Sequence, residues 1–93
     1  MIAARIAFSN PTKAREREQC FDAHKRHLRS GDIKILQSGP FKGAASGSSG
    51  ALVVAEVDAL EELVVFSDRD PFVLAGVYNE IYIVEWTVTL TSK

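Results

Sequence analysis

The chain opens with a strict alternation of positions that is typical of a strand. In residues 2–9, an apolar side chain recurs at every second residue along the chain. This period of two predicts a strand with one well-buried face. The members of this face are Ile2, Ala4, Ile6 and Phe8. Asn10 and Pro11 then predict a helix start, because Asn caps free N–H groups and Pro suits the first helical position.

A charged, glycine-free segment follows from Pro11 to Arg29 and predicts a helix. Phe21, His24 and Leu28 stand three and seven residues apart, so they share one helical face. Gly31 supplies the C-terminal stop. His24 is therefore expected to point toward the sheet rather than into solvent.

The middle of the chain predicts two strands joined by a loop of small residues. Residues 33–38 alternate and are expected to end at Gly39-Pro40, and residues 51–56 are nearly all apolar, as in a central strand. Residues 43–50 consist of Gly, Ala and Ser. We interpret them as a flexible hairpin connection, with a lid that orders over a ligand as the alternative.

A second helix is predicted by a capping signal. Asp58 and Glu61 have the spacing of a capping box, with Asp58 as the cap, and the helix is expected to run to about Ser67. Its inward positions are Leu60, Leu63, Val64 and Ser67. Asp70-Pro71 then predicts a short helical turn that Gly76 ends, and residues 81–89 alternate as a last strand.

The resulting order, β-α-β-β-α-β, predicts an α+β, ferredoxin-like fold with an antiparallel four-stranded sheet. Right-handed crossovers place both helices on one face of that sheet. The other face needs a cover, and the apolar content of 46% in only 93 residues is large for one small domain to bury. We therefore expect a homodimer through the sheet faces, which is a dimeric α+β barrel.

Composition and charge narrow the class of protein. The length predicts a single domain over residues 1–93. With 11 basic and 12 acidic side chains, the net charge of −1 gives no footprint for nucleic acid. No apolar run approaches the roughly 18 residues of a membrane span, and the N-terminus does not resemble a signal peptide. Because the single Cys20 also fits a reducing compartment, we expect a cytoplasmic protein that partners with neither membrane nor nucleic acid.

Three polar residues are candidates for chemistry, each with a structural alternative. His24 on an inward face is either a general acid or base, or a core histidine held by one partner. Asp70 caps the turn at Pro71, and a carboxylate fixed in this way can also orient the imidazole of His24. Arg17, two turns before His24, is either a ligand for an anionic group of a substrate or a member of a structural ion pair.

A metal site is the weaker alternative. Cys20, His24 and His27 have spacings at which one helix could present metal ligands, but no second cluster of such residues completes a shell. We interpret Cys20 as a small core residue and His27 as a flanking one. No dinucleotide-binding or phosphate-binding motif is present, so the sequence predicts no metal and no cofactor.

Several of these residues also carry a resemblance to a known family. The chain resembles the YciI-like (YCII-related) family over nearly its whole length, and the resemblance implies one YciI-like domain over residues 1–93. The residues that carry it are His24, Gly39-Pro40, the segment 50–56, Asp70-Pro71-Phe72, Ala75-Gly76-Val77-Tyr78 and Val84-Glu85-Trp86. The family is similar in fold to muconolactone isomerases and other dimeric α+β barrels. The resemblance implies a site built on His24 and Asp70, with Arg17 matching an arginine often seen near that histidine.

This resemblance suggests a class of activity as well. One family member looks like a dehydrochlorinase acting on a hydroxylated ring, so we expect a small-molecule enzyme of the lyase or isomerase type, using proton transfer on hydroxylated aromatic or lactone-like compounds. The alternative is a non-catalytic module of the same fold that binds a small metabolite or only its partner subunit. One departure is that many members carry an Asp after the first strand, where this chain has Ser9-Asn10.

Overall fold

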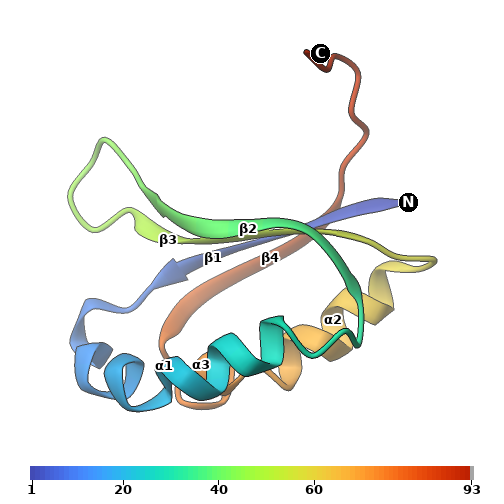
Figure 1. Ribbon diagram of the computed structural model, residues 1–93. Helices are drawn as coiled ribbons and strands as arrows, with labels where there is room; N and C mark the ends of the chain where they lie inside the picture. The colour runs from blue at the N-terminus through green and yellow to red at the C-terminus, as the bar shows by residue number, and fades with distance from the viewer. Residues whose placement is uncertain (93) are drawn as a thin grey trace.

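The computed structural model describes residues 1–92 and confirms the predicted ferredoxin-like order. Its four strands form one antiparallel sheet with the order β2-β3-β1-β4, and all the helices lie against one face of it (Figure 1). The elements are β1 (Ile2–Ser9), a 3-10 turn (Pro11–Lys13), α1 (Ala14–Leu28), β2 (Lys34–Lys42), β3 (Ser49–Glu56), α2 (Leu60–Asp68), α3 (Pro71–Leu74) and β4 (Tyr78–Glu85).

The start of the first helix confirms the cap that the sequence predicts. The side chain of Asn10 accepts a hydrogen bond from the backbone N–H of Thr12 at 3.0 Å, and Pro11 occupies the first position of the turn. The turn continues directly into α1, which ends at Leu28 before Gly31 with a φ of 82°. No helix within residues 1–92 is long and apolar enough to cross a membrane.

The second strand is longer than predicted. We expected Gly39-Pro40 to end it, but β2 continues through both residues to Lys42 and pairs with β3 along the whole of this segment. The prediction was wrong because β2 is an edge strand. A proline that donates no ladder hydrogen bond is tolerated there, where only one side of the strand is paired.

The last strand is displaced toward the N-terminus relative to the prediction of residues 81–89. It begins at Tyr78, opposite Ser9, and ends at Glu85, opposite Ala3. Its neighbour in the sheet, β1, begins at Ile2, whose carbonyl accepts the last bond from the N–H of Trp86 at 2.9 Å. Within residues 1–92 no strand is available for pairing beyond this point, so the alternating segment 86–89 stays outside the sheet.

The second helix begins one residue later than predicted. Ala59 is its N-cap, and the capping carboxylate is Glu62 rather than Glu61. Glu62 Oε2 accepts hydrogen bonds from the backbone N–H groups of Asp58 and Ala59, each at 2.9 Å. Asp58 therefore precedes the cap and does not form it.

The core between sheet and helices is divided in two by a charged residue. Successive inward positions of β1 are Ala3, Arg5 and Ala7, all with no exposed surface. One apolar cluster contains Ala3, Val53, Ala55, Val57, Leu63 and Phe66, and the other contains Ala7, Phe72, Val77 and Tyr78. Because Arg5 lies between the two alanines, a polar layer separates the clusters, and the short side chains beside it leave room for the long one.

The opposite face of the sheet carries larger apolar side chains and has no cover within residues 1–92. Phe8 lies on this face near the end of β1, with edge-to-face contacts to Phe41 at 5.3 Å and to Tyr82 at 6.3 Å between ring centroids. Leu52, Tyr82 and Val84 on this face are each more than a third exposed. The apolar surplus therefore lies where the topology predicts it, on the helix-free face.

A glycine of β3 allows the close packing of this sheet. A Cβ at Gly50 would collide with the carbonyl oxygen of Ala7 and approach Phe41 Cζ to 2.7 Å, whereas a Cβ at Gly39 meets nothing within 4 Å. We expect Gly50→Ala to lower the free energy of unfolding by about 1–3 kcal/mol in urea titrations, as overpacking does. Gly39→Ala is the matched control and should change it far less. Equal stability of the two variants would contradict this packing.

Candidate active site

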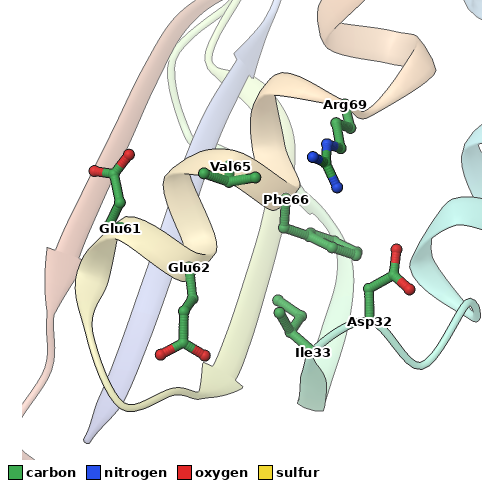
Figure 2. Close-up of a pocket in the computed structure, with 7 residues that line it drawn as sticks. All are labelled: Asp32, Ile33, Glu61, Glu62, Val65, Phe66 and Arg69. Carbon is green, nitrogen blue, oxygen red and sulfur yellow. The ribbon is translucent and has the colours of Figure 1, made fainter.

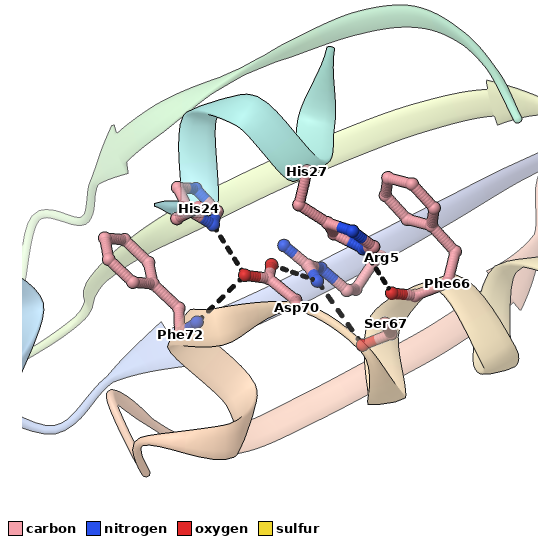
Figure 3. A network of polar contacts seen from close by, with 7 residues as sticks. All are labelled: Arg5, His24, His27, Phe66, Ser67, Asp70 and Phe72. Carbon is pink, nitrogen blue, oxygen red and sulfur yellow. Dashed lines mark hydrogen bonds and ion pairs between the residues drawn. The ribbon is translucent and has the colours of Figure 1, made fainter. Parts of the chain in front are cut away.

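The carboxylate of Asp70 is the centre of a buried polar network. As the N-cap of α3, its Oδ1 accepts a hydrogen bond from the backbone N–H of Phe72 at 2.9 Å. The same oxygen lies 2.7 Å from Nδ1 of His24, and Oδ2 accepts a bond from Nη1 of Arg5 at 2.9 Å (Figure 3). The cap and the partner of the histidine are thus one side chain, and the predicted proximity of His24 and Asp70 is present.

The imidazole of His24 is held from two directions. It is the buried residue of α1, with 7% of its surface exposed, and its ring stacks on Phe72 with 3.8 Å between centroids and an angle of 3°. A carboxylate at Nδ1 favours the tautomer in which Nδ1 carries the proton and donates it to Asp70. The nitrogen that remains for chemistry is Nε2, which has a free lone pair in that tautomer.

Arg5 is a member of this site that the sequence did not identify. It stands in β1 among apolar residues, is fully buried, and donates from Nη1 to Ser67 Oγ at 3.3 Å as well as to Asp70. Its Nε and Nη2 are buried without a hydrogen-bond partner within residues 1–92, and so is the hydroxyl of Tyr78. A buried donor left unpaired costs about 1–3 kcal/mol. The sign of this role in the sequence is that alanine stands two residues before and two residues after Arg5, at Ala3 and Ala7.

The surroundings keep the Asp70 carboxylate ionised. Burial by itself raises the pKa of Asp70, but the hydrogen bond from His24 and the charge of Arg5 act the other way and hold the pKa below its ordinary 3.8. Burial raises the pKa of the Tyr78 phenol above its ordinary 10.0, against the opposing charge of Arg5. At neutral pH, Asp70 is therefore an acceptor and Tyr78 a protonated donor.

A cavity of about 270 Å³ opens beside this network, between α1 and the strands β2 and β3. His24, Arg5 and Tyr78 line it, and the exposed Arg17 lines it too, so the structure brings Arg17 to the same cavity as His24. No carboxylate within residues 1–92 forms an ion pair with Arg17. Ser9 also lines the cavity and contributes no charge to its wall.

The three residues of the weaker metal hypothesis do not converge. His27 Nε2 lies 2.7 Å from the carbonyl oxygen of Phe66, and its ring stacks on that phenyl group. Cys20 is half-buried against the cluster that contains Phe72. In the described part of the chain, no group of three His, Cys, Asp or Glu side chains has the geometry of a metal site.

A second cavity, of about 300 Å³, lies along α2 beside Asp32 and Ile33 but lacks comparable chemistry. Figure 2 shows its acidic side chains spread around the rim rather than converging. Glu62 is engaged in capping the helix, and Asp32, Glu61 and Arg69 are exposed. The convergent polar groups are those around Asp70, which is why we place the candidate site there.

Comparison with protein sequences matches residues 1–87 to the YCII-related domain family. Protein YciI of Escherichia coli O6:H1 (strain CFT073) and protein YciI of Shigella flexneri are each 35% identical to this chain over 54 residues. The matched segment is 52% of this chain and 55% of each relative, so it spans about half the length of these curated proteins.

Solved structures extend the similarity over nearly the whole chain. The 5-chloro-2-hydroxyhydroquinone dehydrochlorinase TftG from Burkholderia phenoliruptrix AC1100, in complex with 2,5-dihydroxybenzoquinone, is 25% identical, with a TM-score of 0.80 over 94% of both chains. A dimeric ferredoxin-like protein of unknown function from Thermobifida fusca YX is 20% identical, with a TM-score of 0.54 over 94% of this chain and 90% of that one. The second comparison shows the fold alone.

The ion pair between Arg5 and Asp70 predicts a large effect of neutralising the carboxylate. Asp70→Asn leaves the guanidinium of Arg5 buried without a counter-charge, so we expect the free energy of unfolding to fall by about 3–5 kcal/mol. Urea titration at pH 7 measures it. Asp68→Asn, at an exposed position of α2, is the control and should change stability by less than about 0.5 kcal/mol.

The sign of the pH dependence follows from the lowered pKa of Asp70. Because the folded state binds a proton at this group less readily than the unfolded state, the contribution of Asp70 is complete above about pH 5 and is lost on acidification through the folded-state pKa. The difference in stability between the wild type and Asp70→Asn should therefore be constant from pH 7 down to that point and shrink below it. A difference that grows in acid would overturn the assignment.

Proposed function

Since the chain belongs to the YCII-related domain family, we propose that it is a small-molecule enzyme of the lyase or isomerase type that works by proton transfer. The observation that carries the proposal is the bond between His24 Nδ1 and Asp70 Oδ1 at 2.7 Å, beside a cavity that His24 lines. This bond fixes the orientation of the imidazole and its tautomer, which are two requirements for a general base.

In the proposed reaction, Nε2 of His24 removes a proton from the substrate. The imidazolium that forms is stabilised by the Asp70 carboxylate, whose lowered pKa keeps it from taking the proton itself. Loss of this proton leaves the substrate as an enolate or phenolate anion. In a dehydrochlorination, chloride then leaves with the bonding electrons, so that one proton and one chloride are lost in balance.

The substrate class that we propose is a small hydroxylated aromatic or lactone-like compound. TftG, which shares the fold at a TM-score of 0.80, acts on a chlorinated hydroxyhydroquinone, and its structure holds 2,5-dihydroxybenzoquinone. In this chain, Arg17 lines the cavity from α1 without a carboxylate partner in the described residues, so its charge is free to hold an anionic oxygen of the substrate.

Replacement of His24 tests the proposal. The wild type is first assayed against a panel of chlorinated hydroquinones and hydroxylated lactones. Release of protons or chloride identifies a substrate. We expect His24→Gln to lower kcat by about 10²–10⁴-fold, because a neutral amide cannot accept the proton. His27→Gln is the matched control, on the same helix but bonded to the Phe66 carbonyl, and should keep turnover.

Two outcomes would contradict the enzyme proposal. Turnover that survives in His24→Gln would exclude the histidine as the base. Binding of panel compounds without turnover by the wild type would instead favour the non-catalytic, metabolite-binding alternative.

We also propose that the helix-free sheet face binds a second copy of this chain. The accessible surface is 6274 Å², whereas a compact monomer of 10.2 kDa has about 5,300 Å². The excess, to which the extended residues 86–92 contribute, is comparable to the area of about 800 Å² per partner in a standard interface. Figure 1 shows this terminal segment leaving the sheet on the side away from the helices.

A charge on the helix-free face tests the homodimer. Val84 lies on this face and is 42% exposed, so Val84→Asp buries a carboxylate in the proposed interface and should convert dimer to monomer. Val65→Asp, 37% exposed on α2, is the matched control and should leave the dimer intact. Light scattering coupled to size-exclusion chromatography measures the mass, and a monomeric wild type at micromolar concentration would refute the proposal.

A further inference from the structure

We infer that the inner wall of the cavity is a binding subsite for a deprotonated oxygen of a small, planar anion, formed by Arg5 and Tyr78. This inference rests on the proposed function and deepens it, because it specifies the charge and shape of the substrate. Arg17 lines the same cavity from α1, whereas Arg5 lies in the middle of β1 and Tyr78 is the first residue of β4.

The first argument is the state of the hydrogen-bond donors. Arg5 uses only Nη1, on Asp70 and Ser67, and in Figure 3 its other terminal nitrogen points toward α1 with no dashed line. Its Nε and Nη2, together with the Tyr78 hydroxyl, have no partner within residues 1–92 although both side chains are at least nine-tenths buried. Buried donors are almost always paired in folded proteins, so these unpaired ones indicate a missing acceptor.

The second argument is charge. Three basic side chains line the cavity, those of Arg5, Arg17 and Lys25. No Asp or Glu of residues 1–92 lines it. Among residues 1–92, the only counter-charge paired with Arg5 is Asp70, which it shares with His24. An acceptor that satisfies the remaining donors and balances this charge is an oxyanion, such as a phenolate, enolate or carboxylate.

The third argument is shape. At about 270 Å³ the cavity lies at the small end of ligand pockets, and Phe21, Phe72, Tyr78 and Pro40 contribute flat surfaces to it. Arg5 Cζ lies 5.4 Å from the ring centroid of Tyr78, so the guanidinium and the phenol ring are neighbours in the cavity wall. A compound of about one ring, with an ionised oxygen at its edge, fits these constraints.

Tyr78→Phe gives the sharpest test because it removes one oxygen atom and nothing else. The hydroxyl has no partner in the described residues, so its loss should leave the free energy of unfolding unchanged or higher. Binding of 2,5-dihydroxybenzoquinone, measured by titration calorimetry, should nevertheless weaken at least about tenfold. Tyr82→Phe is the matched control: its hydroxyl donates to Glu80 on the other sheet face and should not affect binding.

A second variant and a second ligand complete the experiment. Arg5→Lys keeps a charge for Asp70 but loses the remaining donors of the guanidinium, and it should weaken the same ligand. The 2,5-dimethoxy analogue, which cannot ionise, should bind poorly to the wild type and be insensitive to Tyr78→Phe.

The outcomes separate this inference from the function on which it rests. Unchanged affinity in both Tyr78→Phe and Arg5→Lys overturns the subsite, even if His24→Gln abolishes turnover. Equal binding of the dihydroxy and dimethoxy compounds overturns the requirement for an anion. A wild type that does not bind 2,5-dihydroxybenzoquinone overturns the subsite, whereas retained binding in His24→Gln with lost turnover supports both conclusions.

Discussion

The fold depends on one buried interaction, in which the Asp70 carboxylate is shared by Arg5 and His24. Arg5 comes from the central strand β1, His24 from α1 and Asp70 from the cap of α3, so three elements far apart in sequence meet at one group. Breaking such a contact leaves a charge in the interior, which costs far more than losing an apolar contact of similar size. The network therefore fixes the positions of α1 and α3 against the sheet, and the same contact orients the imidazole of His24.

This arrangement explains why the core consists of two apolar clusters. The polar layer around Arg5 prevents one continuous core, and alanines on either side accommodate its side chain. The larger apolar side chains of β1 consequently occupy the opposite face, where Phe8 contacts Phe41 of β2 and Tyr82 of β4. The buried charge of Arg5 and the uncovered apolar face thus both follow from the alternation of side chains along β1.

The sequence predicted the elements whose signals are local and missed those that depend on a neighbour. The cap at Asn10 follows from capping chemistry, and the bounds of β1 follow from its period of two. The approach of His24 to Asp70, 46 residues apart, was expected mainly from the family resemblance. The end of β4 could not be predicted, because it depends on where β1 begins. Arg5 was missed because a charge in a strand is usually on the solvent side, and only the tertiary structure shows that Asp70 is its partner.

The alternation in β1 also constrains how this sequence can evolve. Arg5 faces the site and Ile6, the next residue, faces the other side of the sheet. Because side chains in a strand alternate with a period of two, inserting or deleting one residue upstream of this point while keeping the strand pairing would exchange the faces. The guanidinium would then lie on the apolar face and an isoleucine would stand against Asp70. Length changes in β1 should therefore be rejected by selection even where point substitutions at neighbouring apolar positions are accepted.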